Sequence, residues 1–272
     1  MNGLNKLNNL SKLLKIVDVI FEIADARCPL TSRSKQVTNL IKDKRSILVL
    51  NKSDLADPRV TADWVKFFAD RDEQALPVDA VHGEGMKGVR SVLNREAKRL
   101  NQVLREKGRR KRPLRVAVLG IPNTGKSSFL NRILGKRSVI RGNRPGVTRG
   151  PQWVHVHDTI SVLDTPGLLS PYLKGENVFF ILALVRAIDP ERLEQVNLGE
   201  QLLNFLSSHY ADALLKLGVT DAAPTLESVA GIKGFLTTDG EFDLQRAAVY
   251  LLNSYSKGNL GRISLETPSN FE

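Results

Sequence analysis

The segment Gly120–Ser127 constrains the fold more than any other part of this 272-residue chain. Its sequence, GIPNTGKS, matches the pattern G-x-x-x-x-G-K-[S/T], which needs a strand before the loop and a helix after it. The aliphatic residues 114–119 predict that strand, and residues 127–134 predict that helix. In such a loop, backbone N–H groups and the positive end of the helix bind phosphates. The sequence therefore predicts a nucleotide phosphate site at this junction.

The side chains of this loop have separate expected roles. Lys126 is expected to reach the β- and γ-phosphates, and the Ser127 hydroxyl is expected to bind magnesium. The residues expected to contact the nucleotide phosphates are Asn123, Thr124, Gly125, Lys126, Ser127 and Ser128.

A second motif, LDTPG at 163–167, closes an apolar strand downstream of the phosphate loop. Asp164 is expected to hold magnesium through water, and the Gly167 N–H is expected to contact the γ-phosphate and to sense its loss. Thr148 lies between the two motifs in a polar, Gly-rich segment. It is the candidate second hydroxyl ligand for magnesium, and the alternative is an ordinary loop threonine.

The choice of base is predicted by Asn51-Lys-Ser-Asp54, which follows the apolar run 46–50. A carboxylate such as Asp54 accepts hydrogen bonds from both the ring N–H and the exocyclic amino group of guanine, and adenine presents no such pair. Asn51 is expected to tie this loop to the phosphate loop, and the Lys52 stem is expected to lie against the base. Asp79 and Ala80 form a weaker companion loop, in which the Ala80 N–H is expected to meet the guanine oxygen.

The order of these motifs requires a rearranged domain. In an ordinary GTP-binding domain the phosphate loop comes first and the guanine motif comes near the end. Here the guanine motif stands at 51–54, and no second N-K-x-D follows Gly167. The same site forms only if the domain is circularly permuted. We therefore expect an α/β fold, a permuted P-loop GTPase domain with a mostly parallel sheet between helices.

Hydrophobic patterning divides the chain into two parts. Apolar runs predict strands at 16–25, 46–50, 76–81, 114–119, 152–157 and 160–163. Helical patterning predicts helices at 63–69, 89–104, 127–134, 178–188, 199–217 and 243–256. Because the strands precede a purely helical region, we expect a GTP-binding domain at 1–172 and a smaller all-α domain at 173–272. The charged run 105–113 is expected to be an exposed connector.

The chain resembles the bacterial ribosome biogenesis GTPase A (YlqF) family of circularly permuted GTPases. Beyond the nucleotide motifs, the resemblance rests on DARCPLTSRS at 25–34, RPGVTRGPQW at 144–153 and the tail GNLGRISLETP at 258–268. It covers nearly the whole chain. The resemblance implies a GTPase that helps to complete the large (50S) ribosomal subunit, with both domains contacting ribosomal RNA.

Two features bear on the hydrolysis step. Leu168 stands where many GTPases place a glutamine that orients water, and residues 1–18 lack the catalytic histidine found in an N-terminal segment of relatives. Asn123 is similar to an asparagine that helps to bind potassium in related GTPases; the alternative is that it only stabilises the loop. We expect Lys126, Thr148, Gly167 and Asn123 to contribute to catalysis, with slow hydrolysis that the ribosomal subunit stimulates.

Charge is the remaining guide to partners. The net charge is +11, and residues 1–173 hold 32 basic against 16 acidic side chains, which favours a polyanionic partner. We expect contacts with ribosomal RNA and ribosomal proteins, a monomer when free, and a cytoplasmic rather than mitochondrial location. No apolar run approaches the roughly 18 residues of a membrane span. The alternatives are an RNA-binding scaffold with negligible turnover of its guanine nucleotide, and a GTPase serving a non-ribosomal protein.

Overall fold

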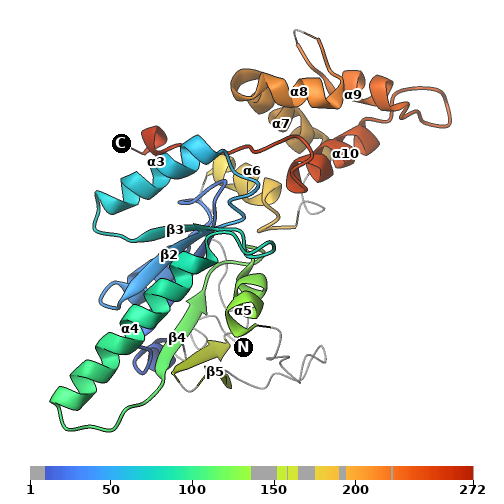
Figure 1. Ribbon diagram of the computed structural model, residues 1–272. Helices are drawn as coiled ribbons and strands as arrows, with labels where there is room; N and C mark the ends of the chain where they lie inside the picture. The colour runs from blue at the N-terminus through green and yellow to red at the C-terminus, as the bar shows by residue number, and fades with distance from the viewer. Residues whose placement is uncertain are drawn as a thin grey trace.

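The computed structural model describes residues 10–135, 152–157, 159–164, 175–189, 194–221 and 223–271. Their strands form one sheet in the order β3-β2-β1-β4-β6-β5 (Figure 1). The strands are β1 (Val19–Asp25), β2 (Ser46–Asn51), β3 (Ala75–Val78), β4 (Leu114–Leu119), β5 (Gln152–His157) and β6 (Ile160–Asp164). Neighbouring strands run parallel, except that β5 pairs antiparallel with β6. This mostly parallel sheet confirms the predicted α/β fold class.

The pairing of β1 with β4 at the centre of the sheet positions the site. Val19 lies opposite Val116, and Glu22 lies opposite Leu119, so the two strands end at the same edge. Strand β2 pairs with the other side of β1 and ends at Asn51. Loops that are distant in sequence thereby meet at the carboxyl edge, where open α/β sheets bind their ligands.

Helices cover both faces of the sheet. Helices α4 (Met86–Glu106) and α5 (Lys126–Leu134) pack on one face, against side chains that include Phe21 and Val118. On the other face, α3 (Pro58–Ala69) buries its aromatic side chains against β1 and β2. Helix α2 (Lys35–Ile41) and the helical residues 10–14 cover the rest of that face.

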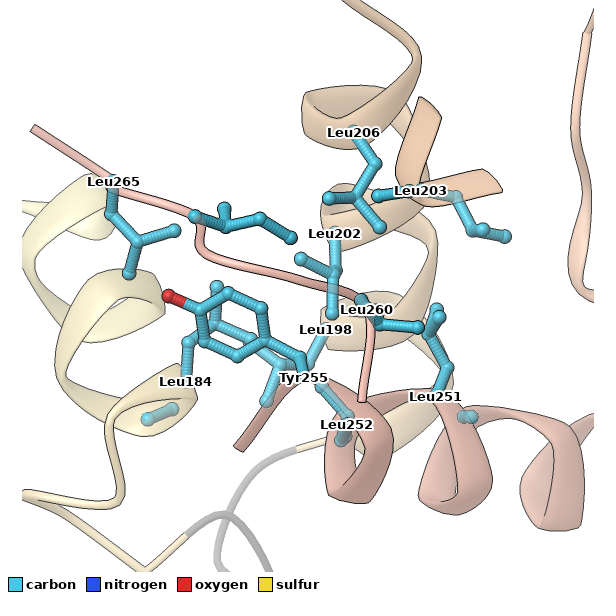
Figure 2. Packing of buried hydrophobic residues seen from close by; sticks show 14 of the residues in the cluster. Leu184, Leu198, Leu202, Leu203, Leu206, Leu251, Leu252, Tyr255, Leu260 and Leu265 are labelled. Atoms are coloured by element: carbon cyan, nitrogen blue, oxygen red, sulfur yellow. The ribbon is translucent and has the colours of Figure 1, made fainter. Parts of the chain in front are cut away.

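A second hydrophobic core joins the helices that follow the sheet. These helices are α6 (Glu176–Leu184), α7 (Gln195–His209), α8 (Ala211–Leu217), α9 (Leu226–Lys233) and α10 (Leu244–Ser256). Leucines repeat every four residues along α7, at Leu198, Leu202 and Leu206, so they lie on one face of the helix (Figure 2). They pack with side chains of α10 and with Leu260 and Leu265 of the following segment, which therefore belongs to this core.

The structure corrects several predicted boundaries. The predicted helix 199–217 is two helices, α7 and α8, which meet at Tyr210, and α9 was not predicted. The predicted connector at 105–113 begins inside α4, which ends at Glu106. The predicted domain boundary at 172–173 lies outside the described residues. Among the helices of the described part of the chain, none is both long and apolar enough to cross a membrane.

Candidate nucleotide-binding site

The loop after β4 has a backbone shape that few residues other than glycine allow. Gly120 and Gly125 have φ angles of 154° and 89°, and Asn123 adopts 60°. A Cβ atom at Gly120 would lie 2.5 Å from the Ile23 carbonyl oxygen, and one at Gly125 would lie 2.1 Å from Asn51 Nδ2. The sequence therefore places glycine where a side chain has no room. Glycine also allows the backbone to approach a ligand closely.

Lys126 begins α5 and has a perturbed charge. Burial, together with the nearby positive charge of Lys52, lowers the pKa of Lys126 to about 8. Its ammonium donates to the Ile121 carbonyl oxygen of its own loop at 2.6 Å, and the first turn of α5 contains no acidic residue. Ser127 is exposed in the same turn. A cation with a lowered pKa at an uncompensated helix N-terminus fits a bound phosphate.

Asn51 joins three loops through its side-chain amide. Its Nδ2 donates to the Thr124 carbonyl oxygen at 2.7 Å, and its Oδ1 accepts from the Ala80 N–H at 3.2 Å. This is the tie between the guanine motif and the phosphate loop that the sequence predicts. Ala80 was expected to offer its N–H to the guanine oxygen, but here that N–H donates to Asn51.

Asp25, at the end of β1, holds the guanine motif in place through Lys52. Its buried carboxylate accepts from Arg27 Nε at 2.9 Å and pairs with Lys52 Nζ at 2.9 Å. Burial alone would raise the pKa of Asp25, but the two cations more than offset this and hold it well below its usual range. No role was predicted for Asp25 and Arg27, although the segment DARCPLTSRS at 25–34 (the DAR segment) contributed to the family resemblance. Their pairing fixes the ammonium of Lys52, whose stem was expected to lie against the base.

Asp54 and Asp79 lie close together but differ in their surroundings. Asp79 accepts from the N–H groups of Val81 (2.8 Å) and His82 (3.0 Å) and from the His82 ring. Burial would raise the pKa of Asp79, but these hydrogen bonds outweigh it and hold that pKa below its usual value. For Asp54, burial and the negative charge of Asp79 both raise the pKa. Asp79 thus organises its own loop, and the half-buried Asp54 remains the candidate for the base.

His82 shows no metal-site spacing with carboxylates along the sequence, yet the structure brings it beside two of them. Ligand atoms of His82, Asp54 and Asp79 lie within 4.8 Å of one another. Spacing along the chain hid this cluster because Asp54 reaches it from a different strand. The bonds from Asp79 to its own loop account for the arrangement without a metal ion.

The structure does not describe two predicted magnesium ligands, Thr148 and Asp164, at the level of their side chains, nor the predicted γ-phosphate contact Gly167. Thr148 and Gly167 lie outside the described residues, as does Leu168. Asp164 is the last residue of β6, which pairs with β4, so it lies at the same carboxyl edge of the sheet as the phosphate loop. Its side chain is not among the described ones. Ser127 is therefore the described part of the predicted magnesium ligand set.

The helical part of the chain contacts the phosphate loop directly. Asn123 Nδ2 donates to the Arg186 carbonyl oxygen, just after α6, at 2.6 Å. Ile121 of the loop and Cys28 of the DAR segment are fully buried in the helical core. Asn123 was predicted either to bind potassium or to stabilise the loop turn. The structure shows a contact that neither alternative included, with the helical part of the chain.

Comparison with known proteins gives the family. A family model described as a 50S ribosome-binding GTPase matches residues 115–228. Ribosome biogenesis GTPase A of Priestia megaterium is 34% identical over 265 residues, which span 95% of this chain and 92% of that protein. The chain belongs to the ribosome biogenesis GTPase A family. The Thermotoga maritima relative of that name is 30% identical over 256 residues, or 94% of this chain and 88% of that protein.

Solved structures agree with this assignment. The crystal structure of GNP-bound YlqF from T. maritima has a TM-score of 0.68 and 28% sequence identity, and the match covers 96% of this chain and 97% of that one. The GDP-bound structure of the same protein gives a TM-score of 0.67. The circularly permuted GTPase fold, predicted from motif order, is thus that of the ribosome biogenesis GTPase A family. Guanine nucleotide, predicted from Asn51-Lys-Ser-Asp54, is the nucleotide of that family.

Proposed function

We propose that this chain is a GTP-binding and GTP-hydrolysing factor for late maturation of the large (50S) ribosomal subunit, which it recognises through ribosomal RNA. The observation that carries the proposal is the Asn51 side chain, which joins the guanine motif to the phosphate loop across a permuted sheet. Such a tie positions two loops for opposite ends of one guanine nucleotide. Membership in the ribosome biogenesis GTPase A family supplies the reaction and its setting.

The proposed division of labour follows the loops. Asn51, Lys52 and Asp54 select guanine, and Asp79 and Ala80 support them. The residues proposed for the phosphates are Asn123, Thr124, Gly125, Lys126, Ser127, Ser128 and Gly167. Ser127, Thr148 and Asp164 would hold magnesium, the last through water, and a bound magnesium ion neutralises charge that develops on the phosphates.

Hydrolysis is proposed to be slow in the free protein and stimulated by the ribosomal subunit. A leucine at 168 supplies no group that orients water. The candidates for electrostatic assistance are Lys126, Thr148, Gly167 and Asn123, and Asn123 is the proposed potassium ligand through its amide oxygen. The bond from Asn123 Nδ2 to Arg186 leaves that oxygen aimed elsewhere, which is compatible with such a role.

The surface proposed for RNA is helix α4 with the segment after it. Residues 86–115 contain twelve Lys and Arg side chains against two Glu, and one of these acids, Glu96, is buried and paired with Arg45. Lys98, Arg105 and Lys111 line a pocket of about 480 Å³ beside amide side chains of α4. Phosphate groups suit such a surface, because each neutralised phosphate releases counterions and adds affinity without base selection.

The remaining parts of the proposal concern organisation and setting. The chain would divide into a GTP-binding domain at 1–172 and an α-helical domain at 173–272, act in the cytoplasm, and be monomeric when free. Ribosomal proteins would be further contacts on the subunit.

The proposal is tested by GTP hydrolysis in potassium and in sodium buffer, with and without purified 50S subunits. We expect stimulation by the subunits and a further gain from potassium. Binding without stimulation would instead support an RNA-binding scaffold, and loss of all subunit binding would refute the ribosomal role.

The RNA surface is tested separately through salt dependence. A triple alanine variant of Lys98, Arg105 and Lys111 should reduce the slope of log affinity against log salt by about 2–3. The matched control replaces three lysines of the helical part, Lys216, Lys233 and Lys257, and should leave that slope closer to the wild-type value. Equal slopes for the two variants would contradict the assignment of this surface.

A further inference from the structure

Residues 258–266 follow α10 and return to the sheet, where they cross the guanine motif; we call them the tail strap. In Figure 1 this red segment runs from α10 past α6 to the N-terminal end of α3. Gly258 has a φ of 77°, and a Cβ atom there would lie 2.6 Å from Leu55 Cδ2. The strap therefore approaches the guanine motif as closely as the absence of a side chain allows.

The strap binds the backbone on both sides of Asp54. Arg262 donates from Nε to the Ala56 carbonyl oxygen at 2.8 Å and from Nη2 to the Ser53 carbonyl oxygen at 2.7 Å. The Ile263 N–H donates to the Leu55 carbonyl oxygen at 2.9 Å. Hydrogen bonds from a charged donor are stronger than those from a neutral one, so Arg262 contributes most to the binding of the strap to this loop.

These contacts extend to the end of the loop. The Asp57 N–H donates to Ser264 Oγ at 3.1 Å, while the Asp57 carboxylate caps the first turn of α3. On the opposite side, the Ser53 N–H donates to the Val78 carbonyl oxygen of β3 at 3.1 Å. Loop 53–57 is thus held between the sheet, α3 and the strap, and its conformation depends on all three.

The strap also holds the DAR segment. The Glu266 carboxylate accepts from the N–H groups of Leu30 (3.0 Å) and Thr31 (3.1 Å), and the Leu265 N–H donates to the Arg27 carbonyl oxygen at 2.7 Å. Arg27 in turn pairs with Asp25, which anchors the ammonium of Lys52. Both residues proposed to contact the base, Lys52 and Asp54, are therefore positioned by one segment.

The strap is itself fixed to the helical part of the chain. Leu260, Ile263 and Leu265 are buried in the helical core, and the Ser264 N–H donates to the Tyr210 hydroxyl at 3.2 Å. A shift of the helices would accordingly move the loop that surrounds Asp54.

We propose that the tail strap determines guanine specificity: Arg262 is a positioning residue that holds loop 53–57 so that Asp54 meets both donors of the base. The inference rests on the proposed function, since it assumes that Asp54 reads guanine. Linkage makes the effect reciprocal, because a nucleotide that favours the docked strap is in turn bound more tightly when the strap is docked.

The test compares GDP with inosine diphosphate, which lacks the exocyclic amino group that Asp54 would accept from. Removing Arg262 breaks two charge-assisted bonds, each of which corresponds to about a tenfold change in equilibrium or more. We expect Arg262→Ala to weaken GDP binding about 10-fold or more, with a clearly smaller loss for inosine diphosphate. Arg262→Lys should recover part of the discrimination. The matched control, Arg246→Ala, alters an exposed arginine of α10 and should leave both affinities unchanged.

The outcomes distinguish a failure of the strap's role from a failure of the proposed guanine recognition by Asp54. An equal loss of affinity for both nucleotides, or no loss, would overturn the role of the strap while leaving the GTPase assignment intact. A wild-type chain that does not distinguish GDP from ADP would overturn the assignment of Asp54 and the strap with it.

Hydrogen exchange on the wild-type chain provides a test that does not depend on how a variant folds. GDP should slow exchange at the Ile263 and Leu265 amides, and inosine diphosphate at the same occupancy should slow it less. Identical protection by the two nucleotides would also refute the proposal.

Discussion

Replacing Asn51 by alanine tests the joint on which the nucleotide site depends. Asn51 is 2% exposed, and its amide satisfies the Thr124 carbonyl oxygen and the Ala80 N–H. Alanine leaves both of these backbone groups without a partner although Thr124 and Ala80 are buried. Asn51→Asp is a sharper companion variant, because it keeps an acceptor for Ala80 but places an oxygen against the Thr124 carbonyl.

The magnitude follows from the two orphaned groups. An unsatisfied buried donor or acceptor costs about 1–3 kcal/mol, so we expect Asn51→Ala to lower the free energy of unfolding by about 2–4 kcal/mol, allowing for partial relaxation. At roughly 2–4 °C for each kcal/mol, Tm should fall by about 5–15 °C. GDP affinity should fall about 10- to 100-fold, since binding must then also align the loops that hold its two ends.

Thermal unfolding of the nucleotide-free protein and fluorescence titration with a labelled GDP measure these two effects. Asn204→Ala, at an exposed asparagine of α7, is the matched control and should leave both unchanged. A Tm within about 2 °C of wild type together with a GDP affinity within about twofold would refute the reasoning, since the orphaned groups would then carry no cost.

Three further predictions concern charge and the tail strap. The pKa of Lys126 is about 8 in the free protein, and bound phosphates favour its charged form. GDP affinity should therefore fall by up to about tenfold per pH unit above pH 8, with proton uptake on binding. Calorimetry in two buffers measures both effects, and a pH-independent affinity would contradict the prediction. Asp25→Asn leaves two cations without their counter-charge and should cost about 3–5 kcal/mol in urea unfolding. In the wild type this stabilisation should be present above the ordinary Asp pKa and lost as pH falls below it, so equal acid sensitivity of the two proteins would argue against it. Trp64→Phe removes the Nε1 donor to the Glu266 carbonyl oxygen and should lower the free energy of unfolding by about 1–2 kcal/mol; no change in denaturant midpoint would disprove that role.

The nucleotide loops were predictable because their chemistry is local. Strand β4 was predicted with its exact bounds, since an apolar run passes directly into a glycine-rich loop. The tie through Asn51 followed from the motif alone, because both loops must contact one ligand. The α/β class followed from the alternation of strands and helices, and the permutation from the order of two motifs.

The helical part was harder to predict because its boundaries depend on tertiary contacts. Tyr210 separates α7 from α8 without a glycine or proline, and its hydroxyl bonds to Ser264, far along the chain. Helix α9 is short and contains Gly231, which weakens its helical pattern, while its capping box of Thr225 and Ser228 was the overlooked signal.

The tail strap was outside the reach of sequence patterns altogether. Its sequence contributed to the resemblance, but nothing in it indicates which carbonyl groups Arg262 meets. Those acceptors are backbone atoms of Ser53 and Ala56, and any residue type presents such atoms. The packing of Leu260, Ile263 and Leu265 in the helical core, far along the chain, helps to bring the guanidinium to them.

The contact between Arg262 and Ser53 spans 209 positions, which has a consequence for biosynthesis. At a translation rate of about 5–20 residues per second, loop 53–57 leaves the ribosome roughly 10–40 s before the strap that holds it. A nascent chain would pair β1, β2 and β3 early, yet it would hold a guanine motif without its support until residues 258–266 emerge. Under the proposed role of the strap, full guanine affinity would therefore be reached only after residues 258–266 have left the ribosome.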